Sequence, residues 1–238
     1  MTDKASHWRL ALMLDSASGD PAALGQELAA MAVWLGEVSP PDAQIRIGAL
    51  KAPITAPPPE PSTPRRFETV DAAIEITVET AQIDALPELA GRIGEAVRPI
   101  VTRGAAMTGP MHRMVPPRDG DVFLSLAFQR APGTTSEEFQ RWWRYQHAQL
   151  CVPLMSPELL AYDQVHLDHA RSRAVAEAAG FTDRYYDAYD NLTWANAQSQ
   201  GPSVTDPNIM RTILEDEIGH IDHATYRGNL LDQLYRSW

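Results

Sequence analysis

The sequence predicts an α+β fold in which two units of the same element order follow one another along the chain. Three observations support this prediction. Apolar residues alternate with other residues in short segments such as 8–14, which is typical of strands. Helix starts carry capping signals, as at Asp20-Pro21. The order β-α-β-β-α-β occurs in residues 1–117 and again in residues 118–238.

The first unit, residues 1–117, contains every element of this order. Asp20 is the predicted N-cap of the first helix and Pro21 its first residue, since both residue types are favoured at those positions. The predicted elements are strand 8–14, helix 21–36, strand 43–50, strand 70–78, helix 83–97 and strand 107–115. This order is the ferredoxin-like, or split βαβ, arrangement.

Proline is concentrated in one insertion of this unit, residues 53–64. Because proline fixes φ and lacks a backbone donor, the insertion is predicted to be an extended loop. A solvated hairpin insertion and an arm that docks across a partner subunit both fit, and the first is favoured.

The second unit, residues 118–238, repeats the order. Asp206-Pro207 restarts its last helix with the same capping signal as Asp20-Pro21. The predicted elements are strand 121–129, helix 135–150, strand 160–167, a helical insertion 168–180, strand 185–193, a helix that begins at 194–200 and restarts at 206, and strand 224–231. The repeat is topological only, because the two halves share no evident residue identity.

Each of the two predicted four-stranded sheets has helices on one face and an uncovered second face. The two sheets can cover these second faces by packing against each other. The sequence therefore predicts two ferredoxin-like βαββαβ units packed sheet to sheet as a dimeric α+β barrel fused in one chain.

Composition excludes several classes of partner. Acidic residues outnumber basic ones by 31 to 20, for a formal charge of −11, which disfavours nucleic acid and anionic membranes. No segment is long and apolar enough to span a bilayer, and the apolar segment 8–14 has the pattern of a strand. Cys151 is the single cysteine, so an intramolecular disulfide is impossible and a cytoplasmic protein is expected.

One helix, at 135–147, carries the strongest candidate for chemistry. Thr135 and Glu138 form a predicted capping box. Phe139, Trp143 and His147 follow at steps of four and share one helix face. Histidine exchanges a proton near neutral pH, so His147 is a candidate general acid or base, with a structural histidine as the alternative.

Two strands carry polar residues in alternation. Tyr162, Gln164 and His166 share one face with Asp168, and the apolar face is expected to pack under the helices. The polar face would then line the space between the sheets. Tyr189 and Asn191 alternate likewise in the next strand and suit a planar, partly polar ligand, although ordinary sheet packing explains tyrosine equally well.

Other chemistries have weaker support. His166 and His169, or His220 and His223, could ligate a metal, but the sequence lacks HExxH and CxxC. Cys151 could be a nucleophile or a buried thiol. GxGxxG, P-loop and nucleophile-elbow motifs are absent from the sequence. We therefore predict neither a metal nor a cofactor.

The second half resembles the EthD family. The segments that carry the resemblance are strand 122–130, the lead 132–139 into the helix, Trp143 with His147, Tyr162-Asp163-Gln164, Tyr186-Asp187-Ala188 (alanine where glycine is usual), Leu192-Thr193-Trp194 and the acidic segment 216–222. The resemblance implies a ferredoxin-like unit whose sheet pairs with a second sheet, usually from another subunit. Here the first half would supply it as a degenerate copy, with Trp34 but no counterpart of His147.

The resemblance also implies a cofactor-independent catalyst or a binder of small aromatic or polyketide-like molecules. We expect a lyase or isomerase that performs dehydration, decarboxylation or similar proton transfer, with His147 as general acid/base. The expected substrate-binding residues are Trp143, Tyr162, Gln164, His166, Tyr189 and Asn191. Two alternative functions remain: a non-catalytic module that binds a hydrophobic metabolite or partner, and a cofactor-free oxygenase. The sequence is also compatible with a homodimer.

Overall fold

The computed structural model describes residues 5–50, 68–155, 158–181, 184–200 and 206–238. The proline-rich insertion predicted at 53–64 lies outside these residues. Among the described residues no helix is long and apolar enough to cross a membrane.

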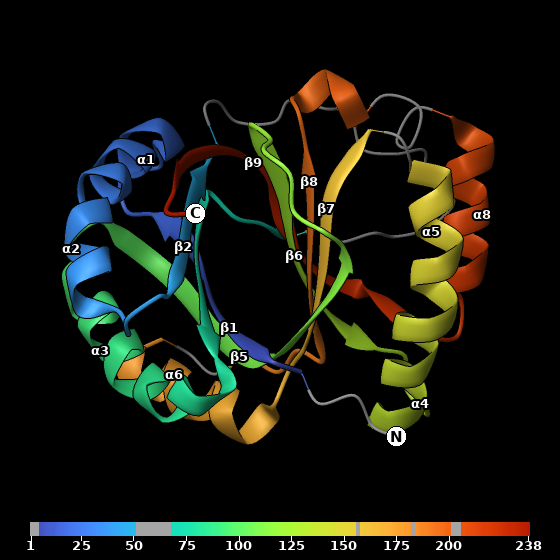
Figure 1. The fold of residues 1–238 in the computed structure, drawn as a ribbon, viewed down its shortest axis with the longest axis horizontal. Helices are drawn as coiled ribbons and strands as arrows, with labels where there is room; N and C mark the ends of the chain where they lie inside the picture. The colour runs from blue at the N-terminus through green and yellow to red at the C-terminus, as the bar shows by residue number, and fades with distance from the viewer. Residues whose placement is uncertain (1–4, 51–67, 156–157, 182–183, 201–205) are drawn as a thin grey trace.

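The first unit has the predicted ferredoxin-like sheet. Its strands pair antiparallel in the order β2-β4-β1-β5. They are β1 (His7–Ser16), β2 (Gln44–Ala49), β4 (Ala72–Glu79) and β5 (Val101–Val115). Its helices α1 (Pro21–Ala30), α2 (Ala32–Val38) and α3 (Leu86–Val97) cover one face of this sheet (Figure 1). A 3₁₀ turn, η1 (Thr80–Ala85), precedes α3.

The second unit repeats this topology in the order β7-β8-β6-β9. Its strands are β6 (Val122–Arg130), β7 (Leu159–His166), β8 (Ala188–Trp194) and β9 (Ile221–Arg236). The helices on its outer face are α4 (Ser136–Trp142), a π-helical turn η2 (Trp143–His147), α5 (Ala148–Met155) and α8 (Pro207–Glu217) (Figure 1). A 3₁₀ turn, η3 (Ala197–Gln200), follows β8.

Two further strand pairings close both sheets into one barrel. β5 pairs with β7, where Met111 lies opposite Val165. β2 pairs with β9, where Arg46 lies opposite Arg236. A two-residue strand, β3 (Glu68–Thr69), runs parallel to β9. The barrel predicted from the repeat is therefore confirmed, and it is completed within one chain.

Strand alternation divides the buried residues into two layers. Leu10, Leu12 and Leu14 of β1 pack under the helices of the first unit. Ala11 and Met13 face the barrel interior, where they meet Val165 of β7. The molecule thus has an apolar core beneath each helical layer and a third, mixed core inside the barrel.

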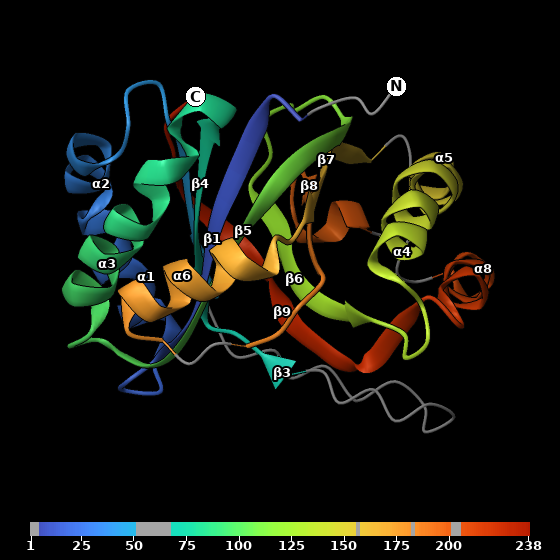
Figure 2. The same cartoon turned by 90° about the horizontal axis from the view of Figure 1, so that it is seen from below.

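Helix α6 (His169–Ala179) follows β7 in the chain but packs against α3 of the first unit (Figure 2). Asp168 caps it by accepting from the backbone N–H of Arg171 at 3.0 Å. Gly94 of α3 permits the close approach, because a Cβ atom there would lie 2.1 Å from the carbonyl oxygen of Ala179.

Several predicted boundaries were inexact. The helix predicted over 21–36 divides at Met31 into α1 and α2. Strands β5 and β9 are longer than predicted, because each pairs along its length with more than one neighbour. Strand β8 begins at Ala188 and not at residue 185, and the helix predicted from residue 194 is the short 3₁₀ turn η3.

Candidate functional site

The candidate site lies between the outer face of the second sheet and the helical segment α4-η2-α5. The predicted capping box is present: Glu138 N–H donates to Thr135 Oγ1 at 3.2 Å, and Thr135 N–H donates to Glu138 Oε2 at 3.0 Å. The segment passes through the π turn η2, which ends at His147. Phe139, Trp143 and His147 are all buried.

The prediction for the polar face of β7 was wrong. Tyr162, Gln164 and His166 lie under the helices and not between the sheets. The opposite set, Asp163 and Val165, faces the barrel interior. The physical reason is that the barrel interior of this protein is itself polar, so Asp163 is needed there to pair with Arg9 at 2.7 Å.

His147 is held by polar and aromatic neighbours. Its Nδ1 lies 2.8 Å from Asp216 Oδ2 of α8, and its Nε2 lies 3.3 Å from Cys151 Sγ one turn along α5. The ring centroid is 4.8 Å from that of Trp142, and Trp142 stacks on His220 at 4.2 Å. Only 5% of His147 is exposed. A buried imidazole and a carboxylate are therefore in contact.

A hydrogen-bonded row of side chains runs along β7 beside this histidine. Gln164 Nε2 donates to the backbone oxygen of Trp143 at 2.9 Å and to Tyr162 Oη at 2.8 Å. His166 stacks on Trp143 with ring centroids 5.1 Å apart. Burial, followed by the charges of His112 and Arg144, lowers the pKa of His166 to about 3, so its imidazole is neutral at physiological pH.

Buried carboxyl groups face the row from β8 and α8. Burial and the charge of Glu217 raise the pKa of Asp190 well above its usual range. Glu217 itself contacts His223 Nε2 at 2.6 Å and accepts from Tyr226 Oη at 3.1 Å.

The nucleophile alternative for Cys151 gains no support from this environment. Burial raises the pKa of the Cys151 thiol, and the neighbouring carboxylates of Glu217, Asp190 and Asp216 raise it further. A reactive thiolate needs the opposite, electropositive surroundings.

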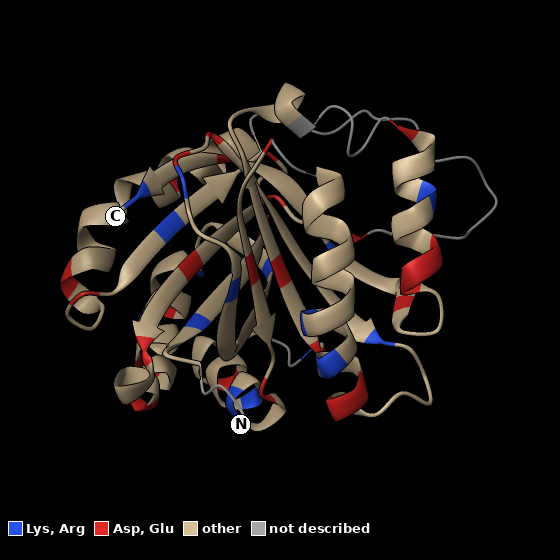
Figure 3. Ribbon diagram, turned by 45° about the vertical axis from the view of Figure 1, so that its right-hand side comes forward, with Lys and Arg blue, Asp and Glu red and all other residues tan. Residues whose placement is uncertain are grey.

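Tyr189 and Asn191, two predicted substrate-binding residues, lie inside the barrel on the other face of the sheet. Tyr189 Oη donates to Glu75, and Asn191 Oδ1 accepts from Arg46 Nη1 at 3.0 Å. Figure 3 shows charged residues of both signs on the barrel strands. The predicted set is therefore divided: Trp143, Tyr162, Gln164 and His166 lie with His147, whereas Tyr189 and Asn191 belong to the barrel interior.

Three site residues were missed by sequence reasoning: Asp190, Asp216 and Trp142. Asp190 could have been recognised in the sequence, because it alternates with Ala188 and Leu192 and therefore shares their buried face of β8. Asp216 lies in the acidic segment already noted, but only the packing of α8 brings it to His147. No group of three or more potential metal ligands occurs in the described part of the chain. In particular, His169 contacts Asp187, whereas His166 stacks on Trp143.

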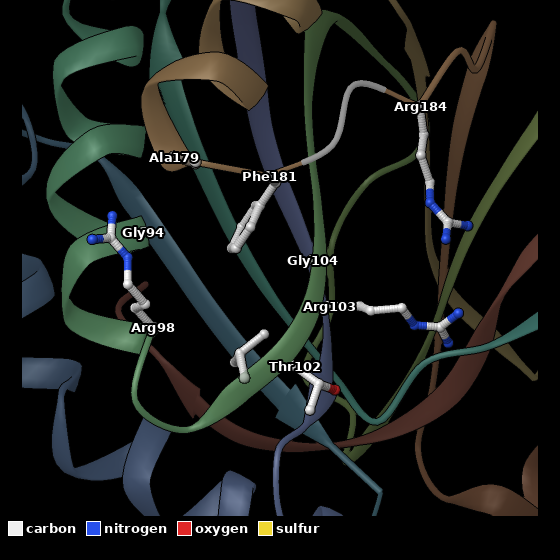
Figure 4. A pocket seen from close by; sticks show the side chains of 10 residues that line it. Gly94, Arg98, Thr102, Arg103, Gly104, Ala179, Phe181 and Arg184 are labelled. Carbon is white, nitrogen blue, oxygen red and sulfur yellow. The ribbon is translucent and has the colours of Figure 1, made fainter.

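A separate cleft of about 280 Å³ lies at the C-terminal ends of α3 and α6 (Figure 4). Arg98, Arg103 and Arg184 line it together with Phe181. Arg103 and Arg184 both pair with Glu68, at 3.1 and 2.6 Å. Because these carboxylate pairs and the negative ends of two helices offset the positive charge, the cleft has no strong preference for an anion.

The fold and the site together define a class: a fused single-chain α+β barrel with a buried polar site under the helices of its second unit. The model of the EthD family, the EthD domain, matches residues 131–224, which confirms the resemblance of the second unit to that family. The residues in direct contact with His147, namely Trp142, Cys151 and Asp216, lie within this segment. No curated protein matched the sequence.

Solved structures match over nearly the whole chain. A candidate monooxygenase from Lactobacillus acidophilus NCFM is 12% identical, with a TM-score of 0.53, and the match covers 98% of this chain and 96% of that protein. A mutant chlorite dismutase from Candidatus Nitrospira defluvii is 8% identical, with a TM-score of 0.56 and coverage of 97% and 92%. These likenesses establish the fold, and at such identities they carry no information on the reaction.

Proposed function

We propose that the site around His147 is an active site for proton transfer and that the protein is a cofactor-independent lyase or isomerase. The observation that carries this proposal is the placement of His147: a buried imidazole whose Nδ1 is bonded to Asp216 at 2.8 Å. Nδ1–H donates to this carboxylate, so the lone pair lies on Nε2. Nε2 then removes a proton from a C–H or O–H group of the substrate.

The substrate class follows from the surfaces beside this histidine. Trp142 and Trp143, whose indole rings stack on His220 and His166, give the site an aromatic character that favours a flat, apolar ring system. Tyr162, Gln164 and His166 supply neutral polar atoms for oxygen substituents. A small aromatic or polyketide-type metabolite combines both features, and dehydration, decarboxylation and isomerisation of such molecules all need one positioned acid–base group.

The test is a comparison of wild type with His147→Ala. Untargeted metabolite profiling of a cell extract first identifies a compound that the wild-type protein depletes. His147→Ala should deplete it about 10² to 10⁴ times more slowly, which is the usual contribution of a positioned acid–base group. His7→Ala removes a histidine of β1 that is not part of the proposed site and should keep full activity. Equal rates for wild type and His147→Ala would refute the proposal.

A binding module is the second candidate, and one observation favours it. Both ring nitrogens of His147 have partners within the protein, which also suits a structural histidine. In that case His147→Ala changes the affinity for a metabolite and no compound is depleted. The oxygenase alternative is tested by measuring oxygen consumption with an electrode, because only an oxygenase consumes oxygen as the compound disappears.

A further inference from the structure

Several buried polar atoms beside His147 have no hydrogen-bond partner among the described residues. They are Trp143 Nε1, Gln164 Oε1, His166 Nε2, Asp190 Oδ1 and His220 Nδ1. Buried polar atoms are nearly always paired, because each unpaired one costs about 1–3 kcal/mol. Their gathering under one helical segment indicates a site that receives a polar ligand.

The orientation of the Gln164 amide is determined by its partners. Its nitrogen must face the backbone oxygen of Trp143, because a carbonyl oxygen only accepts. Gln164 Nε2 also donates to Tyr162 Oη, so the Tyr162 hydroxyl is free to donate onward. Tyr162 and Asp190 lie close enough for each to influence the pKa of the other. The row therefore runs from Gln164 to Tyr162, with Asp190 beside its end.

Among the described residues, the main influences on the charge of Asp190 include no cation. The titratable groups that act on it are acidic or neutral: Glu217 from α8, Asp163 and Tyr162 from β7. Cys151 of α5 is also close enough to interact with its charge. A buried carboxyl group in such surroundings keeps its proton, and a protonated carboxyl can donate a hydrogen bond. Oδ1 is the oxygen of Asp190 that has no hydrogen-bond partner among the described residues, so a proton there is free to bond to a ligand.

We infer that Asp190 is a second catalytic residue of this site, which donates a hydrogen bond from Oδ1 to a carbonyl or phenol oxygen of the ligand on which His147 acts. The inference deepens the proposed function and rests on it. When His147 Nε2 takes a proton from the carbon next to a carbonyl, the C–H electron pair forms a C=C bond. The carbonyl π pair moves to oxygen, where the Asp190 hydrogen bond stabilises the enolate.

Infrared difference spectroscopy tests the protonation of Asp190 without any substrate. At pH 7 the wild-type protein should show the carbonyl band of a buried protonated carboxyl group, and the isosteric variant Asp190→Asn should lack it. His147→Ala should keep the band, so this readout is independent of the proposed function. If the wild-type and Asp190→Asn spectra are identical in this region, the inference is wrong.

Ligand binding is tested with 4-nitrophenol, a flat ring with one phenol oxygen, by quenching of tryptophan fluorescence. Asp190→Ala should weaken binding about tenfold, the value of one hydrogen bond of about 1.4 kcal/mol. Asp190→Asn retains a donor and should weaken binding less. Equal affinity in wild type and Asp190→Ala, or absence of binding by wild type, would overturn the assignment. The two proposals can fail separately. If His147→Ala loses activity while Asp190→Ala keeps it, the proposed function is supported and this inference alone is refuted.

Discussion

Desolvation sets the protonation of the two buried titratable groups that flank His147. It lowers the pKa of His166 to about 3 and raises that of Asp190 well above its usual range. The His166 imidazole is therefore neutral near pH 7, and the shift at Asp190 favours its protonated, neutral form. Neutral donors and acceptors match a carbonyl or hydroxyl group better than a charged ligand, because a buried charge without a partner is costly.

The dependence of the free energy of unfolding on pH should reveal the shifted pKa of His166. Its pKa in the folded protein, about 3, lies below the value of 6.5 expected when unfolded, so the unfolded state binds more protons between these values. Stability must therefore fall as the pH falls through this window. His166→Phe keeps a flat ring against Trp143 and should flatten the slope by up to about 1.4 kcal/mol per pH unit in urea unfolding. His7→Phe is the control, and an unchanged slope in His166→Phe would contradict the pKa assignment.

At the scale of elements, two helical features place the site and its scaffold. The π turn η2 interrupts the helix between α4 and α5 and ends at His147. Such turns are rare and are often found at functional sites. On the other side of the barrel, α6 leaves its own unit to pack on α3, which ties the two halves together outside the barrel as well as through its strands.

The contact between α3 and α6 should depend on Gly94. Gly94→Ala places a Cβ 2.1 Å from the Ala179 carbonyl oxygen, and overpacking of this kind costs about 1–3 kcal/mol of unfolding free energy. Gly36→Ala in α2 meets nothing within 4 Å and should instead stabilise the protein by about 0.5–1 kcal/mol. Chemical denaturation of both variants measures the difference. If Gly94→Ala were as stable as Gly36→Ala, the close packing of α3 on α6 would be refuted.

At the scale of the whole molecule, buried ion pairs join the two units inside the barrel. Arg9 of the first unit pairs with Asp163 of the second at 2.7 Å and with Glu75 at 3.6 Å. Arg46 shares Glu75 at 3.4 Å and reaches Asn191 of the second unit. The charged groups approach one another only when the two sheets pack in one register, so the network specifies how the units meet.

Removal of one carboxylate should show the cost of leaving this network unbalanced. Asp163→Ala leaves Arg9 buried with less compensation and should destabilise the protein by about 3–5 kcal/mol. Glu137→Ala breaks the exposed pair with Arg141 and should cost about 0.3–0.5 kcal/mol. Urea unfolding compares the two. A loss in Asp163→Ala as small as that in Glu137→Ala would show that the buried pairs contribute little.

The pKa of Asp163 is lowered by Arg9 and Arg113 despite its burial. Because the folded-state pKa is below the unfolded value of 3.8, this stabilisation is present above that value and is lost as the pH falls toward the folded pKa. Acid should therefore loosen the contact between the units.

The sequence by itself determined the elements and their order. Local rules act within a few residues, so the caps at Asp20, Thr135 and Asp206 and the alternation in β1 could be read directly. The repeated order then predicted the barrel, because each sheet has one face covered by helices and must bury its second face. His147 could be proposed as a candidate because its spacing from Trp143 is visible in the chain.

Only the tertiary structure decided which face of each strand meets which layer. Alternation separates Tyr162, Gln164 and His166 from Asp163 and Val165, but it cannot say which set lies under the helices when both layers accept polar groups. That choice depends on partners far away in sequence: Arg9 for Asp163, and Trp143 for Gln164. Asp190 and Asp216 joined His147 for the same reason, since contacts between distant segments exist only once the chain has folded.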